Sequence, residues 1–251
     1  MIDTVPVGNA GNANDPADGD SFTAGIQNFG AVSFAFNIGK YEVTNAQYAE
    51  FLNAKAKSDP LGLYNPNMGK VAIQLGGIAR SGAPGNYSYT VIAGRGQRPV
   101  GLINWFRAVR FANWLHNGQG NGDTETGAYT LGKLGADGNP LNSTSITRNP
   151  GAKWFLPTEN EWYKAAYHKN DGATGNYFKH ATSSDVAPII EAPPGGSNSA
   201  NYFLFPNDLT NVGAYTGTTS PYGAFDMAGN VNEWNESLLV PGSGPSRGLR
   251  G

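Results

Sequence analysis

Glycine constrains this chain more than any other residue type, with 35 glycines among 251 residues. Glycine accepts backbone conformations that other residues avoid, and it gathers in turns and irregular loops. Proline and asparagine add to this tendency, above all in residues 57–98 and 117–151, where only short apolar runs occur. We therefore expect the chain to spend much of its length in long loops.

Long loops need something to hold them, because loops of more than about 15 residues are uncommon in compact domains unless they are functional. The sequence has no cysteine, which excludes disulfide bonds, thiolate metal ligands and a thiol nucleophile within it. Tryptophan packing and bound cations are the remaining means of holding the loops. The apolar content of 39% still indicates a globular chain with a core.

The low charge of the sequence narrows the classes of partner. Charged residues make up 14%, the formal net charge is −2, and no Lys or Arg cluster stands out, so we expect no nucleic-acid partner. No stretch reaches the ~18 apolar residues of a transmembrane helix, so we expect no membrane insertion. The first 16 residues lack the charged and apolar regions of a signal peptide, although a removed leader would leave no trace.

Three short helices are predicted from capping signals followed by apolar stripes. Two of them begin with a capping box, formed by Thr44 with Gln47 and by Thr158 with Glu161. The second helix is apolar on several sides, which predicts burial on more than one side. The predicted helices are Asn45–Lys55, the run 105–115 capped by Asn104, and a third helix that ends near His168.

Strand signals are shorter and weaker. Alternating apolar residues over 31–44 predict strands in a hairpin that turns near Gly39, and small hairpins are expected at 86–94 and 127–132. The last third of the chain has no helical pattern. Turns and short strands are expected there, through 211–215 and 222–234.

The stretch "AFDMAGNVNEWNE" offers hard oxygen ligands at close spacing. Asp226 and Glu233 can supply carboxylates, and Gly229 and Val231 can supply carbonyls if the chain curls at Gly229–Asn230. From the spacing alone, a turn-forming aspartate and a solvated surface glutamate are the simpler interpretation. No nucleophile lies nearby, so an acid–base catalytic pair is disfavoured.

Other chemical signatures have little support. The three histidines lack H-E-x-x-H or H-x-H spacing, G-x-S-x-G does not occur, and the glycine-rich runs lack the strand–loop–helix context of phosphate loops. Asp15, Asp18 and Asp20 lie in one loop that can bind a cation, although a solvated loop is the simpler interpretation.

Four segments in order resemble one family: "GKYEVTNAQYAEFLN", "RPVGLINWFRAVRFANWL", "FLPTENEWYKAAY" and "PYGAFDMAGNVNEW". This is the formylglycine-generating enzyme, or sulfatase-modifying factor, domain family, and the resemblance spans about Ile38 to Trp234. The ending "SRGLRG" resembles the start of that family's R-G-G-S segment. Three segments are most similar in sequence to a bacterial extracytoplasmic branch of the family, often found in PEP-CTERM-sorted proteins: "NSANY", "VGAYTGTTSPYGAFD" and "NEWNE".

The resemblance implies the fold class and the domain organisation. It implies an α+β, C-type-lectin-like single domain with few short helices and strands and long loops. Residues 1–29 are interpreted as an N-terminal loop or extension, and residues 30–251 as a sulfatase-modifying-factor-like domain that is incomplete at its C-terminus. It also implies an extracytoplasmic location, secreted or on the cell surface.

The resemblance further implies structural calcium. The family's first ligand set falls on the Asp226 side chain, the Gly229 and Val231 carbonyls and the Glu233 side chain. A second set would begin at Asn201 and the carbonyl of Tyr202, with Asp208 in place of the family's later acidic loop. If Glu233 is a ligand, Glu233→Ala should destabilise the protein more than Glu191→Ala.

The same resemblance leaves two functions open. Enzymes of the family oxidise a protein cysteine with copper held by two cysteines that follow the R-G-G-S segment, and this sequence stops at Gly251 without any. The histidine set of the iron-dependent relatives is also missing. We therefore expect a non-catalytic, calcium-stabilised lectin-like binding or structural domain with a protein or glycan ligand. The alternative is a copper oxidase whose cysteines lie beyond Gly251.

In the binding-domain interpretation, aromatic side chains on the long loops contact the ligand. Ordinary packing is the competing interpretation for each of them, since tyrosine lines cores and rims alike. The residues concerned are Tyr87, Tyr89, Tyr129, Tyr177, Phe178 and Tyr202.

Overall fold

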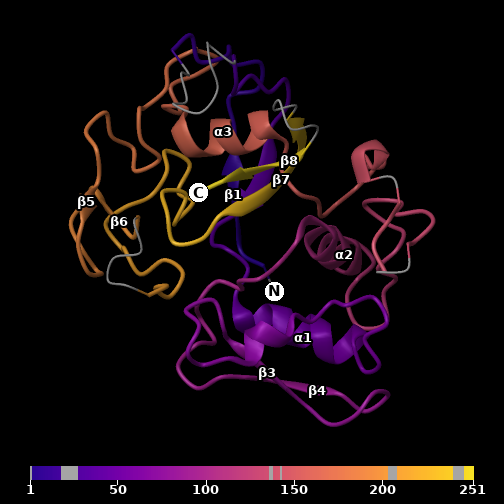
Figure 1. Cartoon of the computed structure of the whole chain (residues 1–251). Helices are drawn as coiled ribbons and strands as arrows, with labels where there is room; N and C mark the ends of the chain where they lie inside the picture. Colours follow the sequence, from indigo (N-terminus) through magenta and orange to yellow (C-terminus); the bar gives the residue numbers. More distant parts are fainter. Residues whose placement is uncertain (1, 18–27, 136–137, 142, 203–207, 240–245) are drawn as a thin grey trace. The chain divides into compact units, whose positions relative to one another are not determined.

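A computed structural model describes residues 2–17, 28–135, 138–141, 143–202, 208–239 and 246–251 (Figure 1). Contacts between residues divide the chain into two compact units, each assembled from separate stretches of sequence. Unit 1 comprises Met1–Glu42, Pro157–Asn235 and Leu249–Gly251, and unit 2 comprises Val43–Leu156 and Glu236–Gly248.

Unit 2 is built on two helices, α1 (Asn45–Lys55) and α2 (Trp105–His116). Both begin as predicted: Thr44 forms its capping box with Gln47, and the Asn104 side chain accepts a hydrogen bond from the Arg107 backbone N–H. A hairpin of β3 (Ile78–Ser81) and β4 (Ser88–Val91) contacts α1, and short 3₁₀ helices lie at Pro66–Gly69 and Ser143–Ser145.

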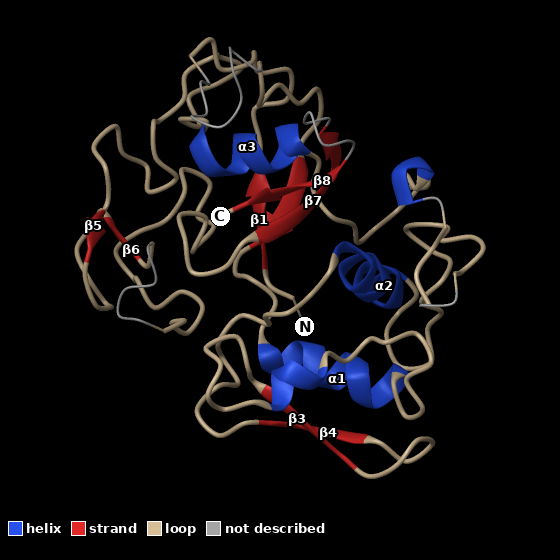
Figure 2. Cartoon of the chain, viewed as in Figure 1, coloured by secondary structure: helices blue, strands red, loops and turns tan. Residues whose placement is uncertain are grey.

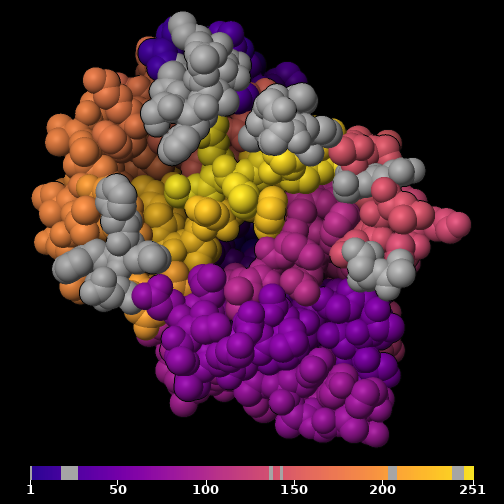
Figure 3. All heavy atoms as spheres, viewed as in Figure 1, coloured from indigo at the N-terminus to yellow at the C-terminus, as the bar shows by residue number. Residues whose placement is uncertain are grey.

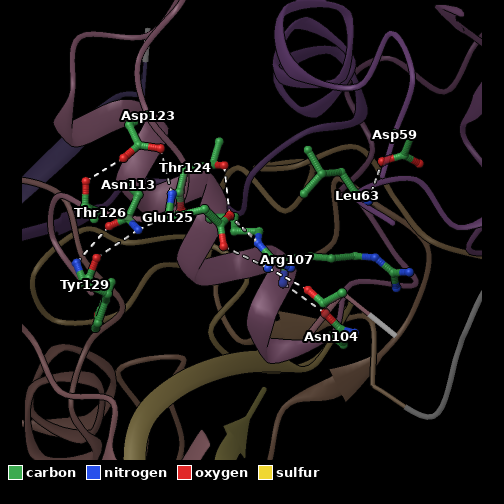
Figure 4. Close-up of polar contacts among 12 residues, drawn as sticks. Asp59, Leu63, Asn104, Arg107, Asn113, Asp123, Thr124, Glu125, Thr126 and Tyr129 are labelled. Atoms are coloured by element: carbon green, nitrogen blue, oxygen red, sulfur yellow. Dashed lines mark hydrogen bonds and ion pairs between the residues drawn. The ribbon is translucent and has the colours of Figure 1, made fainter. Parts of the chain in front are cut away.

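The core of unit 2 is aromatic. Phe51, Phe111 and Trp114 pack with ring centroids 5.3–5.7 Å apart, and α2 is buried on more than one side, as predicted. Polar side chains of α2 also hold the following loop. The Asn113 amide donates to the carbonyls of Thr124 and Tyr129 and accepts the Tyr129 N–H (Figure 4).

Unit 1 contains α3 (Glu159–Tyr167), whose capping box with Thr158 and Glu161 also forms as predicted. An antiparallel pair joins β1 (Thr4–Val7) to β2 (Phe36–Gly39), and β5 (Ile189–Ile190) runs parallel to β6 (Ser199–Ala200) (Figure 2). The buried core of the unit comprises Val7, Trp162, Ala165, Ala166, Ala181, Tyr222, Ala224 and Met227. Finally, β7 (Glu233–Leu239) pairs with β8 (Ser246–Arg250), and both strands include residues assigned to unit 1 and residues assigned to unit 2.

Several strand predictions were wrong. The strand at 36–39 does not turn back near Gly39 but pairs with β1, which lies in the segment interpreted as a loop. Residues 127–132 form no local hairpin, because Tyr129 forms a bridge with Arg148 instead. Residues 211–215 and 222–232 are turns, and the strand in that region begins only at Glu233.

The described elements are nevertheless few and short and are joined by long loops, as the sequence predicted. No helix among the described residues combines the length and apolar character needed to cross a membrane.

Candidate metal centre

The stretch that carries Asp226 and Glu233 is anchored in the core of unit 1. Ala224 and Met227 belong to that core, and they are 1% and 4% exposed. At the other end of the stretch, the buried Trp162 of α3 donates its indole N–H to a Glu233 carboxylate oxygen. Helix α3 thus orients the predicted ligand Glu233, and core packing of Ala224 and Met227 fixes the backbone around the predicted ligand Asp226.

The chain curls between these two acids, as expected from the glycine. Asp226, Gly229 and Asn230 all have positive φ angles, of 58°, 105° and 63°. A Cβ atom added at Gly229 would lie 2.3 Å from the carbonyl oxygen of Asn201, so a larger residue would clash with backbone. Glycine is required here both for the conformation and for the close approach.

Asp226 and Glu233 are held by neutral donors, and both are half-buried. The Asp226 carboxylate accepts the Gly213 N–H at 2.6 Å, and burial raises its pKa to about 6. Burial, together with the charge of Asp226, raises the pKa of Glu233 to about 7, although the Trp162 hydrogen bond opposes this. Neither acid forms an ion pair in the described part of the chain.

A third carboxylate, Glu42, lies at the same place and was missed in the sequence. It is 8% exposed and accepts hydrogen bonds from the Asn230 side chain at 2.9 Å and the Val231 N–H at 3.3 Å. Burial raises the pKa of Glu42 well above its usual value, and the charges of Asp226 and Glu233 raise it further. Its only sequence signal was an acid between two apolar stretches of the "GKYEVTNAQYAEFLN" motif.

The second predicted ligand set lies directly against the first. The Asn201 carbonyl accepts the Asn230 N–H at 2.8 Å, and the Asn201 side-chain amide donates to the Asp208 carbonyl at 3.0 Å. The other amide atom, Oδ1, is buried and has no hydrogen-bond partner among the described residues. Such an orphaned acceptor is unusual in a native protein and suits a cation or a water molecule. The Tyr202 hydroxyl points elsewhere, donating to the Pro188 carbonyl.

A small cavity lies beside this contact, with a volume of about 10 Å³. Asn201, Asp226 and Asn230 line it, together with several hydroxyl-bearing side chains. A polar cavity needs roughly this volume to hold one water molecule. The cavity therefore suits a single water molecule or ion and no larger ligand.

The donors fit calcium, with one qualification. They are all oxygens, as calcium prefers, and they combine carboxylates with a turn rich in backbone carbonyls. In the described residues, however, no three side chains of Asp, Glu, His or Cys converge closely enough to hold a metal ion. A calcium ion would therefore depend on the carbonyls of Gly229 and Val231 and on water, as well as on Asp226 and Glu233.

The other candidate residues have structural partners. Tyr89 and Tyr129 are 3% and 0% exposed, so the prediction that they contact a ligand was wrong, whereas the remaining four aromatics are half-buried. Asp15 accepts the Tyr163 hydroxyl, which ties its loop to α3. Asp18 and Asp20 lie outside the described residues.

The comparisons with known proteins agree with this architecture. The sequence matches the sulfatase-modifying factor enzyme 1-like domain over residues 7–251, and the chain therefore belongs to that family. A solved structure, described as the crystal structure of CarF, aligns with 96% of this chain and 82% of its own, with a TM-score of 0.51 and 23% sequence identity. No curated protein sequence matches the chain.

This likeness concerns the fold, because the sequence identity with CarF is low. The α+β, C-type-lectin-like fold of the family, with few short helices and strands, is confirmed. The narrower assignment to a PEP-CTERM-associated branch stays a prediction, and so do the domain boundary at residue 30 and the incomplete C-terminus.

Proposed function

We propose that this chain is a non-catalytic binding or structural domain whose loops are stabilised by calcium. The observation that carries the proposal is a set of buried or half-buried carboxylates with no cationic partner among the described residues. Acids removed from water need a proton, a cation or a paired base. Bound calcium would supply the positive charge, held by Asp226, Glu233 and the carbonyls of Gly229 and Val231.

The second ligand set supports the same role. The unpartnered Oδ1 atom of Asn201, with Asp208 beside it, would complete a further oxygen site next to the curl at Gly229. The Tyr202 carbonyl is the remaining proposed ligand there. Ions at these positions would hold together loops that are far apart in the sequence, which is the task that disulfides perform in other loop-rich domains.

The non-catalytic part of the proposal depends on residue types. The family's oxidases use thiolates to bind copper, and this sequence contains no cysteine. The alternative is an oxidase acting on a protein cysteine, which family membership favours. In that case the copper ligands would have to come from outside these 251 residues.

We also propose an extracytoplasmic location, with a protein or glycan as the ligand. Extracellular calcium modules bind with dissociation constants of about 10⁻⁴–10⁻³ M, which suits a site with few converging side chains. Cell fractionation with an antibody against the native protein would test the location.

Thermal unfolding tests the calcium role directly. We expect calcium to raise the melting temperature over that in excess chelator, because a ligand at 100 times its dissociation constant adds about 2.7 kcal/mol of stability. Magnesium at the same concentration should have a smaller effect, since it demands stricter geometry. Identical melting curves with calcium and with chelator would sink the proposal.

A matched pair of variants assigns the effect to the site. Glu233→Gln should reduce the calcium-dependent rise, and Glu50→Gln, at an exposed position on α1, should leave it unchanged. Glu191 is a poor control, because its side chain accepts hydrogen bonds from Ser199 and Gly196. Separately, incubation with copper and a cysteine-containing peptide should give no aldehyde, and aldehyde formation would overturn the non-catalytic assignment.

A further inference from the structure

We propose that Glu42 is a positioning residue of the cation site, which fixes the Asn230–Val231 turn and, when ionised, adds a negative charge beside the proposed ligands. The inference rests on the proposed calcium role and adds to it a residue from a distant part of the sequence. Glu42 is separated from Asn230 by 188 positions, and it precedes the cap of α1 by two residues.

The geometry of Glu42 supports positioning rather than direct ligation. One carboxylate oxygen accepts the Asn230 side-chain amide, and the other accepts the Val231 N–H. The two contacts hold consecutive residues from one side, which fixes the peptide group that precedes the proposed Val231 carbonyl ligand. Since both oxygens already accept hydrogen bonds and the acids do not converge on one point, Glu42 acts on the ion through the turn.

The same contact joins the two ligand sets. Asn230, which donates to Glu42, accepts at its own side-chain oxygen the Asn201 amide at 3.3 Å and the Thr210 N–H at 3.0 Å. Glu42 therefore fixes the residue that lies between the two proposed calcium sites. A substitution of Glu42 should therefore weaken calcium binding at both proposed sites.

The charge argument is independent of the hydrogen bonds. In the described part of the chain, Glu42, Asp226 and Glu233 form no ion pair. Lys40, two residues from Glu42, instead lies over the rings of Tyr41 and Phe225 at 5.3 and 5.7 Å. Three like charges in one buried region repel one another, and a divalent cation removes that repulsion.

Glu42→Gln separates this role from a purely structural one, because glutamine keeps the shape and one acceptor oxygen but loses the charge. If Glu42 contributes charge and position, the variant should bind calcium more weakly than the wild type, in addition to any stability that the lost hydrogen bond costs in chelator. A residue that only contributed hydrogen bonds would destabilise the chelated protein when replaced and leave the calcium affinity unchanged.

Affinity can be measured with terbium, a luminescent substitute for calcium, excited through Trp162, whose indole contacts Glu233. Calcium titration calorimetry provides a label-free check. We expect Glu42→Gln to weaken binding roughly 10- to 100-fold, the usual effect of losing an outer-shell partner of a metal ligand. Glu50→Gln should bind as the wild type does.

Glu42→Asp provides a second variant if Glu42→Gln does not fold. It keeps the charge but shortens the reach to Val231, so affinity should fall less than in Glu42→Gln, with no gain of stability in chelator. If the wild type responds to calcium and the Glu42 variants respond equally, this inference fails alone. If the wild type itself shows no response, the proposed function fails and the inference with it.

Discussion

Two regions of the molecule stabilise carboxylates that are withdrawn from water in opposite ways. In unit 2, the fully buried Arg110 pairs with Glu125 at 2.7 Å, and Arg148 pairs with Glu236 at 2.9 Å. In unit 1, the acids of the candidate metal centre are held by amide and indole N–H groups without an ion pair among the described residues.

The difference concerns what each region needs from its surroundings. A carboxylate paired with arginine has its counter-charge within the fold, so the stability of that region should not depend on a bound cation. A cluster of unpaired acids needs protons or a cation from solution, because its own charges repel. The candidate metal centre should therefore respond to calcium, and the arginine pairs should not.

The largest loss of stability is expected when an arginine pair of unit 2 is removed. Arg110→Met should lower the free energy of unfolding by about 3–5 kcal/mol, because it leaves Glu125 and the Gly138 carbonyl without their buried partner. Urea denaturation with and without calcium should give the same loss. A loss that appears only in chelator would contradict the separation between the two regions.

A smaller effect is expected from pH at the unpaired region. In chelator, the folded-state pKa values of Glu233 and Asp226, about 7 and about 6, lie above their ordinary values. The folded protein then binds more protons than the unfolded chain, so the free energy of unfolding should fall as pH rises from about 4.5 to 7.

Saturating calcium should reverse or flatten this slope, because the cation stabilises the ionised acids. Chemical denaturation at several pH values, with calcium or with chelator, measures both slopes. A chelated protein whose stability rises steadily with pH over this range would contradict the raised pKa values.

The smallest effect is expected from helix capping, which should contribute equally to stability in the two units. Thr44→Ala and Thr158→Ala each remove a capping-box hydroxyl, and each should cost about 1 kcal/mol. The two losses should be similar and should not depend on calcium, because helix capping is local in both units. Thermal unfolding of the pair measures this. A calcium-dependent loss for Thr44→Ala would show that the metal acts beyond the acidic stretch.

Local features were predictable from the sequence alone. The three helices and their caps follow from signals within a few residues, and the curl at Gly229–Asn230 follows from the freedom of glycine. Four ordered motifs predicted the family, which the match over residues 7–251 confirms. The proposed calcium ligands Asp226, Gly229, Val231 and Glu233 could be predicted because they lie within one short segment that matches a family motif.

Long-range pairing was decided only by the tertiary structure. Whether strand 36–39 pairs with its neighbours or with Thr4–Val7 depends on which partner completes the core, and periodicity alone does not tell. Glu42 was missed for the same reason, since its contacts lie 188 and 189 positions away. The sequence determined which residues could offer oxygen ligands to a cation. The folded chain determined that a third acid lies beside them with no ion-pair partner in the part of the chain that the structure describes, because burial and proximity exist only after folding.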